Sequence, residues 1–303
     1  MGTRRLMEAL LALAGLLQVA LSLKIAAFNI RAFGESKMNN VTLSNYITQI
    51  VSDYDIALIQ EVRDSHLVAV GKLLDKLNRD VPDSYHYVVS RPLGPSTYKE
   101  RYLFLHRRDQ VSVLDSYDYT REHCKDHPCS NHTFSRPPIV VKFSSPCTHV
   151  KTFTIVPLHA APEAAAAEID ALYDVYQDVR EKWATEDIML MGDFNAGCRY
   201  VTEAQWPGIR LRTDPALQWL IDDTADTTVT STYCPYDRIV VSGTLLQEAV
   251  VPDSATTFDF EAAYKLSKSM ALAISDHYPV EVTLKRTQCT QNPVTLGPAP
   301  GHG

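Results

Sequence analysis

Polar side chains stand at the ends of several apolar runs, where a buried strand would not ordinarily place them. The run 188–191 is wholly apolar, yet Asp193 and Asn195 follow it just after Gly192. In α/β folds, loops at strand ends meet on one edge of a rigid sheet and build ligand sites there. We therefore interpret these residues as parts of one site. The other members of the set are Asn29, Glu61, His159, Asp237, Asp276 and His277.

The residue types in this set indicate metal-assisted hydrolysis of a phosphate ester. The carboxylates and amides offer oxygen ligands, which suit magnesium or calcium rather than zinc. Histidine is the residue type best suited to acid–base work near neutral pH, so the two histidines could transfer protons. The sequence contains no P-loop, no GxGxxG and no GxSxG motif, which argues against a covalent serine hydrolase. The expected metal ligands are Asn29, Glu61, Asp193, Asn195 and Asp276.

Apolar and amphipathic segments are spread along the whole chain and predict one α/β domain that carries these residues. Residues 164–183 have apolar side chains at helical spacing, which predicts a long helix with one buried face. Shorter helices are predicted at 42–52 and at 65–79, the latter with Asp64 as its N-cap. Strands are expected at 24–30, 56–62, 85–90, 102–107, 111–117, 139–145, 153–159, 188–194, 237–243 and 278–284.

The first residues have the pattern of a cleaved signal peptide. A basic pair precedes an apolar stretch that is too short and too interrupted to span a membrane, and small residues stand at Ala20 and Ser22. We therefore expect a secreted, extracellular protein with no membrane partner. The expected division is a signal peptide at 1–22, a single folded domain at 23–285 and a disordered tail at 286–303.

Cysteine usage and two sequons agree with secretion. Six cysteines in an oxidising compartment favour disulfides. The triplets NVT at Asn40 and NHT at Asn131 are N-glycosylation sequons. The net charge of −7 argues against a basic protein that coats nucleic acid. It does not exclude an enzyme that meets phosphate through a metal ion and a few local arginines.

Nine motifs in order resemble the secreted deoxyribonuclease I family, from about Leu23 to Lys285. They are AAFNIRAFG, DIALIQEVRDSHL, YKERYLF, IVPLHAAP, EIDALYDVY, LMGDFNAGC, DDTADTTVTST, CPYDRIV and AISDHYPVEV. More distantly, the chain resembles the wider group that contains exonuclease III, inositol phosphatases and neutral sphingomyelinase. The resemblance implies a four-layer α/β/β/α sandwich, in which two packed mixed sheets are flanked by helices. It also implies a monomeric endonuclease that cleaves double-stranded DNA with little sequence preference and leaves 5′-phosphate ends.

The resemblance also assigns roles within the site. Glu61 is similar to the family's principal magnesium carboxylate, with Asn29 and Asp276 beside it. Asp193 and Asn195 look like metal and phosphate ligands. The catalytic pairs of the family match His159 with Glu100 and His277 with Asp237. One imidazole would activate water and the other would protonate the leaving 3′ oxygen.

Other family features fall on matching positions. Asp226, Thr228 and Thr232 match a structural calcium loop, so Mg²⁺ and Ca²⁺ are the expected cofactors. The family's two disulfides imply the pairs Cys124–Cys129 and Cys198–Cys234, of which the second closes the longer loop. The residues that resemble DNA contacts are Arg31, Arg63, Tyr98, Arg136 and Tyr236.

Several positions depart from the family pattern. Pro137 stands where the family's second calcium site usually has a glutamate, and Cys147 and Cys289 lie outside the usual disulfides. The segment 87–89 resembles the edge strand of the actin-binding members. Arg91 and Ile139 replace a glutamate and an alanine there. Weak inhibition by monomeric actin is therefore expected.

Two other functions compete with that of a nuclease. One is a related phosphoesterase that acts on a lipid or inositol phosphate head group, and the other is a non-catalytic binding protein with the same fold. The motif YKERY and the Arg63–Tyr98 pair favour DNA, because a small head-group site has no role for them. The complete set of histidines and carboxylates argues against a non-catalytic protein.

Overall fold

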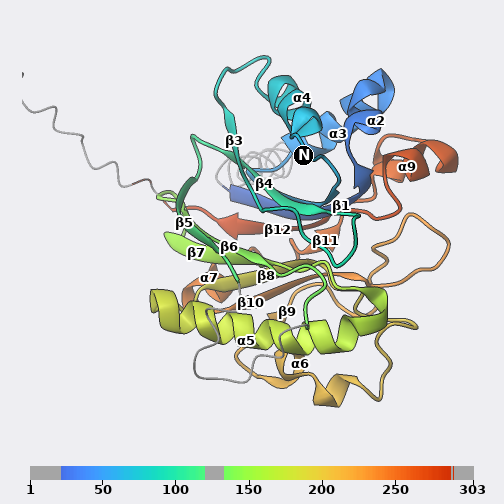
Figure 1. Cartoon of the computed structure of the whole chain (residues 1–303). Helices are drawn as coiled ribbons and strands as arrows, with labels where there is room; N and C mark the ends of the chain where they lie inside the picture. Colours follow the sequence, from blue (N-terminus) through green and yellow to red (C-terminus); the bar gives the residue numbers. More distant parts are fainter. Residues whose placement is uncertain (1–21, 120–132, 288, 290–303) are drawn as a thin grey trace, which may run out of the picture.

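Two six-stranded mixed sheets packed face to face form the centre of the molecule, and helices cover both outer faces (Figure 1). The computed structural model describes residues 22–119, 133–287 and 289. The α/β/β/α sandwich expected from the sequence is confirmed.

The first sheet has the strand order β11-β12-β1-β2-β4-β3, in which only the β1–β2 pair is parallel. Its strands are β1 (Ser22–Phe33), β2 (Ile56–Val62), β3 (Tyr85–Val89), β4 (Arg101–Arg107), β11 (Thr256–Thr257) and β12 (Val280–Lys285). The helices on its outer face are α2 (Glu35–Asn39), α3 (Val41–Ser52), α4 (Val68–Leu77), α8 (Phe260–Ala263) and α9 (Lys268–Ile274).

The second sheet has the order β5-β6-β7-β8-β10-β9, in which only the β7–β8 pair is parallel. Its strands are β5 (Ser112–Asp118), β6 (Ile139–Ser144), β7 (Thr152–Pro157), β8 (Ile188–Asp193), β9 (Gln218–Trp219) and β10 (Asp237–Ser242). Its outer face is covered by α5 (Ala165–Trp183) and α6 (Arg210–Thr213), while α7 (Thr244–Ala249) packs on the core between the sheets.

Most strands are apolar on both sides because both faces of each sheet are covered. Ile25 and Ala27 of β1 point into the core between the sheets, whereas Ala26 and Phe28 point toward the helices. This alternation is the two-residue period of a strand. It explains why the expected strands appear in the sequence as continuous apolar runs. The two-residue strands β9 and β11 and the short helices were not predicted, because they are too short to show a periodic apolar pattern.

The starts of two helices depend on polar side chains. Asn40 caps α3, and its Oδ1 accepts from the backbone N–H of Thr42 at 3.0 Å and of Leu43 at 3.1 Å. Helix α4 begins at Val68 rather than at residue 65, because Leu67 has a left-handed backbone with φ of 58°. Asp64 is therefore not the N-cap by position. Its carboxylate still accepts from the first turn, at 3.0 Å from Val68 N and 3.0 Å from Val70 N.

The ordered chain extends further at its C-terminal side than expected. Arg286 pairs with Thr148 in an isolated bridge, and Thr287 N donates to the carbonyl of Cys147 at 2.8 Å. A disulfide joins Cys147 to Cys289. The expected disordered tail from residue 286 is therefore wrong for these residues, because strand pairing and a covalent bond hold them. At the other end, β1 begins at Ser22, one residue before the expected start of the domain.

Candidate active site

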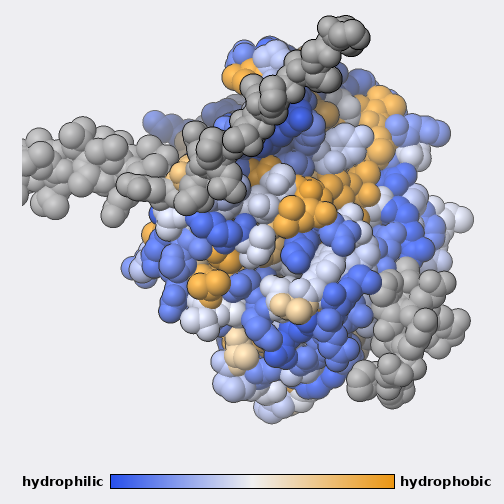
Figure 2. All heavy atoms as spheres, turned by 90° about the vertical axis from the view of Figure 1, so that its left-hand side faces the viewer, coloured by the Kyte–Doolittle hydropathy of each residue, from blue (hydrophilic) through white to orange (hydrophobic). Residues whose placement is uncertain are grey.

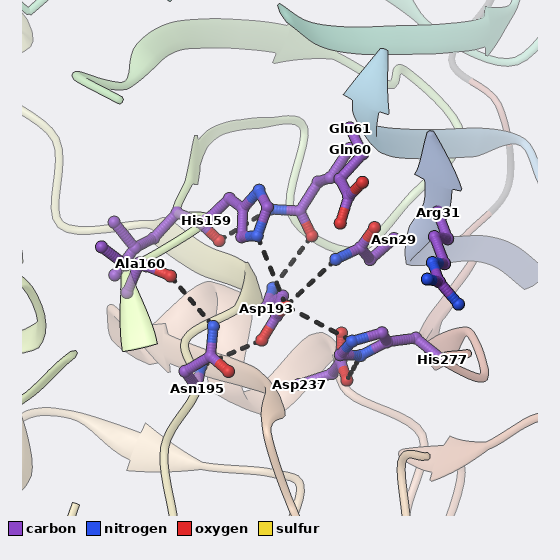
Figure 3. A network of polar contacts seen from close by, with 12 residues as sticks. Asn29, Arg31, Gln60, Glu61, His159, Ala160, Asp193, Asn195, Asp237 and His277 are labelled. Carbon is purple, nitrogen blue, oxygen red and sulfur yellow. Dashed lines mark hydrogen bonds and ion pairs between the residues drawn. The ribbon is translucent and has the colours of Figure 1, made fainter. Parts of the chain in front are cut away.

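The polar residues of the strand ends lie together at one end of the two sheets (Figure 3). Asp193 ends β8, and Asp237, the first residue of β10, stands directly opposite it in the ladder. Asn29 of β1 is paired in register with Gln60 of β2. The topology thus brings residues that are far apart in the sequence to one edge of the sandwich.

Asp193 is the centre of this arrangement. It is buried, and its Oδ2 accepts from Asn29 Nδ2 at 3.0 Å while its Oδ1 accepts from Asn195 N at 3.0 Å. The Nε2 atoms of His159 and His277 each lie 3.6 Å from Asp193 Oδ2. Both imidazoles therefore face one point from opposite sides.

His159 is oriented by a buried carboxylate. Its Nδ1 lies 3.1 Å from Glu100 Oε2, which also receives Arg136 Nε at 2.6 Å. Burial alone would raise the pKa of Glu100, but the hydrogen bond and charge of His159, with the charges of Arg136 and Arg63, lower this pKa to about 2. Glu100 is therefore ionised at neutral pH and fixes the ring that faces Asp193.

His277 has an equivalent partner in Asp237, which is wholly buried. The distance from His277 Nδ1 to Asp237 Oδ2 is 2.7 Å. Burial raises the pKa of the Asp237 carboxyl. Burial would lower the pKa of His277, but the charges of Asp237 and Asp193 outweigh this effect and raise it. The two imidazole–carboxylate pairs expected from the family pattern are thus present as contacts.

Glu61 stands on an irregular stretch of backbone. The pairing of β1 with β2 shifts register between Asn29 and Phe33, and the pairing of β2 with β4 shifts between Ile59 and Val62. Glu61 itself has φ of 57°, which is strained for a residue other than glycine. Its Oε2 accepts from Ala32 N at 2.9 Å and lies 2.8 Å from Arg63 NH2. Such bulges re-aim a side chain at the edge of a sheet.

Three buried oxygen atoms at this site have no hydrogen-bond partner among the residues that the structure describes. They are Asn29 Oδ1, Asp237 Oδ1 and Asp276 Oδ1. In addition, ligand atoms of Asp193, Asp237 and His277 lie within 4.8 Å of one another. A buried oxygen without a partner is costly, and a divalent cation with oxygen ligands would satisfy it. The oxygen atoms among these donors therefore fit a divalent cation.

Arg63 and Tyr98, which resemble DNA contacts, form a pair beside the site. The guanidinium lies 4.4 Å from the centre of the Tyr98 ring, and its NH1 donates to the Tyr98 hydroxyl at 2.9 Å. Tyr98 is exposed. The pair lines a cavity of about 440 Å³ with two further cationic side chains, Lys99 and Arg101. This surface is suited to an anionic ligand.

The other three expected DNA contacts differ in exposure. Arg31 is exposed, and its Nε lies 3.8 Å from Asp276 Oδ2. Arg136 is largely buried, since it pairs with Glu100 and donates to the carbonyl of His159 at 3.2 Å. The buried ring of Tyr236 lies 6.4 Å from the His277 ring.

The residues of the expected calcium loop are gathered in space. Asp226 Oδ1 accepts from Thr228 N at 3.0 Å and from Thr228 Oγ1 at 3.1 Å. The Thr228 and Thr232 hydroxyl oxygens lie 3.2 Å apart. The loop is closed by a disulfide between Cys198 and Cys234, as the family pattern implies. Cys124, Cys129 and Asn131 lie outside the described residues.

The segment that resembles an actin-binding surface is an edge strand. Of the strands in the described residues, β3 pairs only with β4, and Tyr87 is exposed on it. Figure 2 shows a band of hydrophobic residues across the face that carries the edge strands β3 and β5. Arg91 is exposed and lies 3.9 Å from Asp118. The expectation that Ile139 adds bulk at the contact with actin is wrong. The Ile139 side chain is 6% exposed and packs in the core between the sheets.

Several positioning residues were missed by sequence reasoning. The Gln60 amide spans the two sheets, since it donates to Leu158 O at 2.7 Å and accepts from Asp193 N at 2.9 Å. Gly192 allows this approach, because a Cβ there would lie 2.4 Å from Leu158 O. Ser275 Oγ donates to Asn29 O at 2.6 Å and accepts from His277 N at 3.3 Å. The only signal for Gln60 was a polar residue inside an apolar strand.

Comparisons with known proteins agree with this geometry. Residues 26–277 match the model of the Endonuclease/Exonuclease/phosphatase family. Deoxyribonuclease-1 of Sus scrofa is 73% identical over 94% of this chain and 100% of its own length, and that of Equus caballus is 74% identical over 92% and 98%. A solved endonuclease/exonuclease/phosphatase of Bacteroides vulgatus has a TM-score of 0.57 at 19% identity and covers 88% of this chain and 99% of its own, a likeness of fold alone.

Proposed function

The chain belongs to the deoxyribonuclease I group of the endonuclease/exonuclease/phosphatase family and is a DNA-hydrolysing endonuclease; from this premise we propose which form of DNA it cleaves, which metal ions it requires and which ends its products carry. The proposal is a secreted, magnesium-dependent enzyme that cleaves double-stranded DNA with little sequence preference and leaves 5′-phosphate ends. The observation that carries it is the convergence of two imidazole–carboxylate pairs on Asp193, with both Nε2 atoms 3.6 Å from one oxygen.

In the proposed mechanism the two histidines divide the proton transfers. One imidazole takes a proton from the attacking water as its oxygen bonds to phosphorus. The other, as imidazolium, protonates the 3′ oxygen as the phosphorus–oxygen bond breaks, which leaves the phosphate on the 5′ side. Glu100 and Asp237 hold the two rings in place through their contacts with the Nδ1 atoms.

Oxygen atoms of Asn29, Glu61 and Asp276 would hold the magnesium ion, with Asp193 and Asn195 on the phosphate side of the site. When bound, the ion would stabilise negative charge on the phosphate. Arg31, Arg63, Tyr98, Arg136 and Tyr236 would contact the duplex. Contacts to phosphate and to the minor groove position DNA with little base choice, which supports sequence-tolerant cleavage.

Chelation of divalent cations is expected to abolish cleavage of supercoiled plasmid, and added magnesium should restore it. The products should carry 5′-phosphates, which a ligase accepts without prior kinase treatment. Cleavage that persists in excess chelator would overturn the metal requirement. An intact plasmid alongside hydrolysis of an inositol phosphate would instead support the head-group phosphoesterase.

Secretion, glycosylation and calcium binding belong to the same proposal. The signal-like beginning, the two described disulfides and the exposed sequon residue Asn40 support secretion. None of the helices within the described residues is long and apolar enough to cross a membrane. Calcium at Asp226, Thr228 and Thr232 would stabilise the loop closed by Cys198–Cys234, because the ion would bind side-chain oxygens that already lie close together there.

We expect weak inhibition by monomeric actin. This expectation depends on Arg91 alone, because the Ile139 side chain is buried. Where actin-binding relatives carry a glutamate, an arginine reverses the charge, and a like-charge contact can cost several kcal/mol. Arg91→Glu should therefore tighten inhibition by about tenfold or more. The measurement is DNA hydrolysis during an actin titration, with Arg79→Glu as a charge-matched control. Stoichiometric inhibition of the native protein would contradict this view.

A further inference from the structure

Arg199 and Tyr200 form a second arginine–tyrosine pair at the surface. The Arg199 guanidinium lies 5.0 Å from the centre of the Tyr200 ring, and its NH2 donates to the Tyr200 hydroxyl at 3.0 Å. Arg199 is exposed. Within the part of the chain that the structure describes, the side chain that Arg199 bonds is the Tyr200 hydroxyl rather than a carboxylate. Its positive charge is therefore available to an anion.

This pair is held rigidly relative to the catalytic centre. Cys198, which precedes it, has a left-handed backbone with φ of 50° and is bonded to Cys234. The Tyr200 ring packs 5.2 Å from the ring of Tyr236, which in turn lies 6.4 Å from His277. The loop after β8 and the loop before β10 are thus fastened together beside one catalytic histidine.

The pair has the same construction as Arg63–Tyr98 and lies on the other side of the site. Contacts run from Arg63 through Glu100 to His159, and from there to Asp193. They continue from Asp193 through His277 and Tyr236 to Tyr200. At each end of this series, an arginine guanidinium lies over a tyrosine ring. The first pair comes from the first sheet and the second from the loops of the second sheet.

We propose that Arg199 is a backbone-phosphate contact that extends the DNA footprint on the His277 side of the cleaved bond. The guanidinium presents planar N–H donors that match phosphate oxygens, and the Tyr200 ring and hydroxyl fix its orientation. Because phosphate contacts carry no sequence information, Arg199 adds affinity without base choice. The inference rests on the proposed function, since it requires double-stranded DNA as substrate.

The test is the salt dependence of duplex binding by Arg199→Ala, measured on the His159→Ala background so that the DNA is not cleaved. Loss of one phosphate contact should reduce the slope of log affinity against log salt by about 0.9. The affinity advantage of the unsubstituted protein should therefore shrink by about 3.5-fold between roughly 50 and 200 mM NaCl. Arg199→Lys should keep most of the slope, because it keeps the charge.

Arg79→Ala is the matched control. Arg79 is exposed and precedes β3 at the end of the sheet that is opposite the site, since Tyr85 pairs with Arg107. In the active enzyme, Arg199→Ala should raise KM and leave kcat unchanged, with an unchanged melting temperature. A slope and KM equal to those of the control would overturn the role of Arg199. Failure of the native protein to bind and cleave duplex DNA would overturn the proposed substrate instead.

Discussion

Alanine at His159 is expected to reduce DNA hydrolysis by roughly 10²–10⁴ while the protein stays as stable as the native enzyme. The imidazole faces Asp193 at 3.6 Å and can transfer a proton at the reacting phosphate. Its partner Glu100 keeps two ion pairs after the substitution, with Arg136 at 2.6 Å and Arg63 at 3.2 Å. No buried charge is left alone, so unfolding should not change.

His277→Ala should cause a similar loss of activity with a different effect on stability. Asp237 is wholly buried, and His277 is the basic group that faces it at 2.7 Å. Without the ring, this carboxylate loses its counter-charge, which costs stability or protonates the acid. The melting temperature should therefore fall in His277→Ala and not in His159→Ala.

Initial rates on supercoiled plasmid and thermal unfolding measure both variants. His149→Ala serves as the control, because His149 is half exposed and lies in the β6–β7 turn at the opposite end of the second sheet. Retention of half the activity in His159→Ala or His277→Ala would end the acid–base assignment of that residue.

Removal of the Cys147–Cys289 disulfide is expected to lower the free energy of unfolding by about 5 kcal/mol. The bond joins residues 142 apart in sequence, and a cross-link that closes a long loop restricts the unfolded chain strongly. It also connects the chain after β12 of the first sheet to the β6–β7 turn of the second. Both ends lie opposite the catalytic edge, so activity should remain.

Urea unfolding of the double variant Cys147→Ser, Cys289→Ser tests this expectation. Mass spectrometry should first establish that Cys198–Cys234 is still formed, so that the loss belongs to one bond. The Cys198–Cys234 bond closes a loop with a separation of 36 residues, for which the same estimate is about 4 kcal/mol. A double variant with native stability would show that the unfolded state is already restricted without this bond.

The sequence predicted which residues lie together at this edge of the sandwich better than it predicted how they are held. Asp193 and Asn195 were identified because polar residues directly follow an apolar run. The pairing of His277 with Asp237 came from family resemblance, since no local pattern joins residues 40 positions apart. The strained backbone of Glu61 depends on register shifts against two neighbouring strands, which side-chain periodicity does not record.

Tertiary packing explains the corrections. Ile139 begins the apolar run of β6, and its side chain is covered by the opposite sheet in the core between the sheets. Cysteine spacing does not determine pairing, so the bond between Cys147 and Cys289 and the ordered segment beyond residue 285 became visible only in three dimensions. Leu67 blocks the early start of α4 through its backbone conformation, although the apolar spacing continues toward Asp64.

The cap of α3 has a consequence for handling the protein. A glycan on Asn40 would be attached through Nδ2, which leaves Oδ1 to accept from Thr42 and Leu43 as it does now. An amidase that releases the sugar converts this asparagine to aspartate. Aspartate is an equally good N-cap, and its negative charge is favourable at the positive end of a helix. Deglycosylated protein prepared for crystals should therefore keep α3 intact, with a new charge at its first turn.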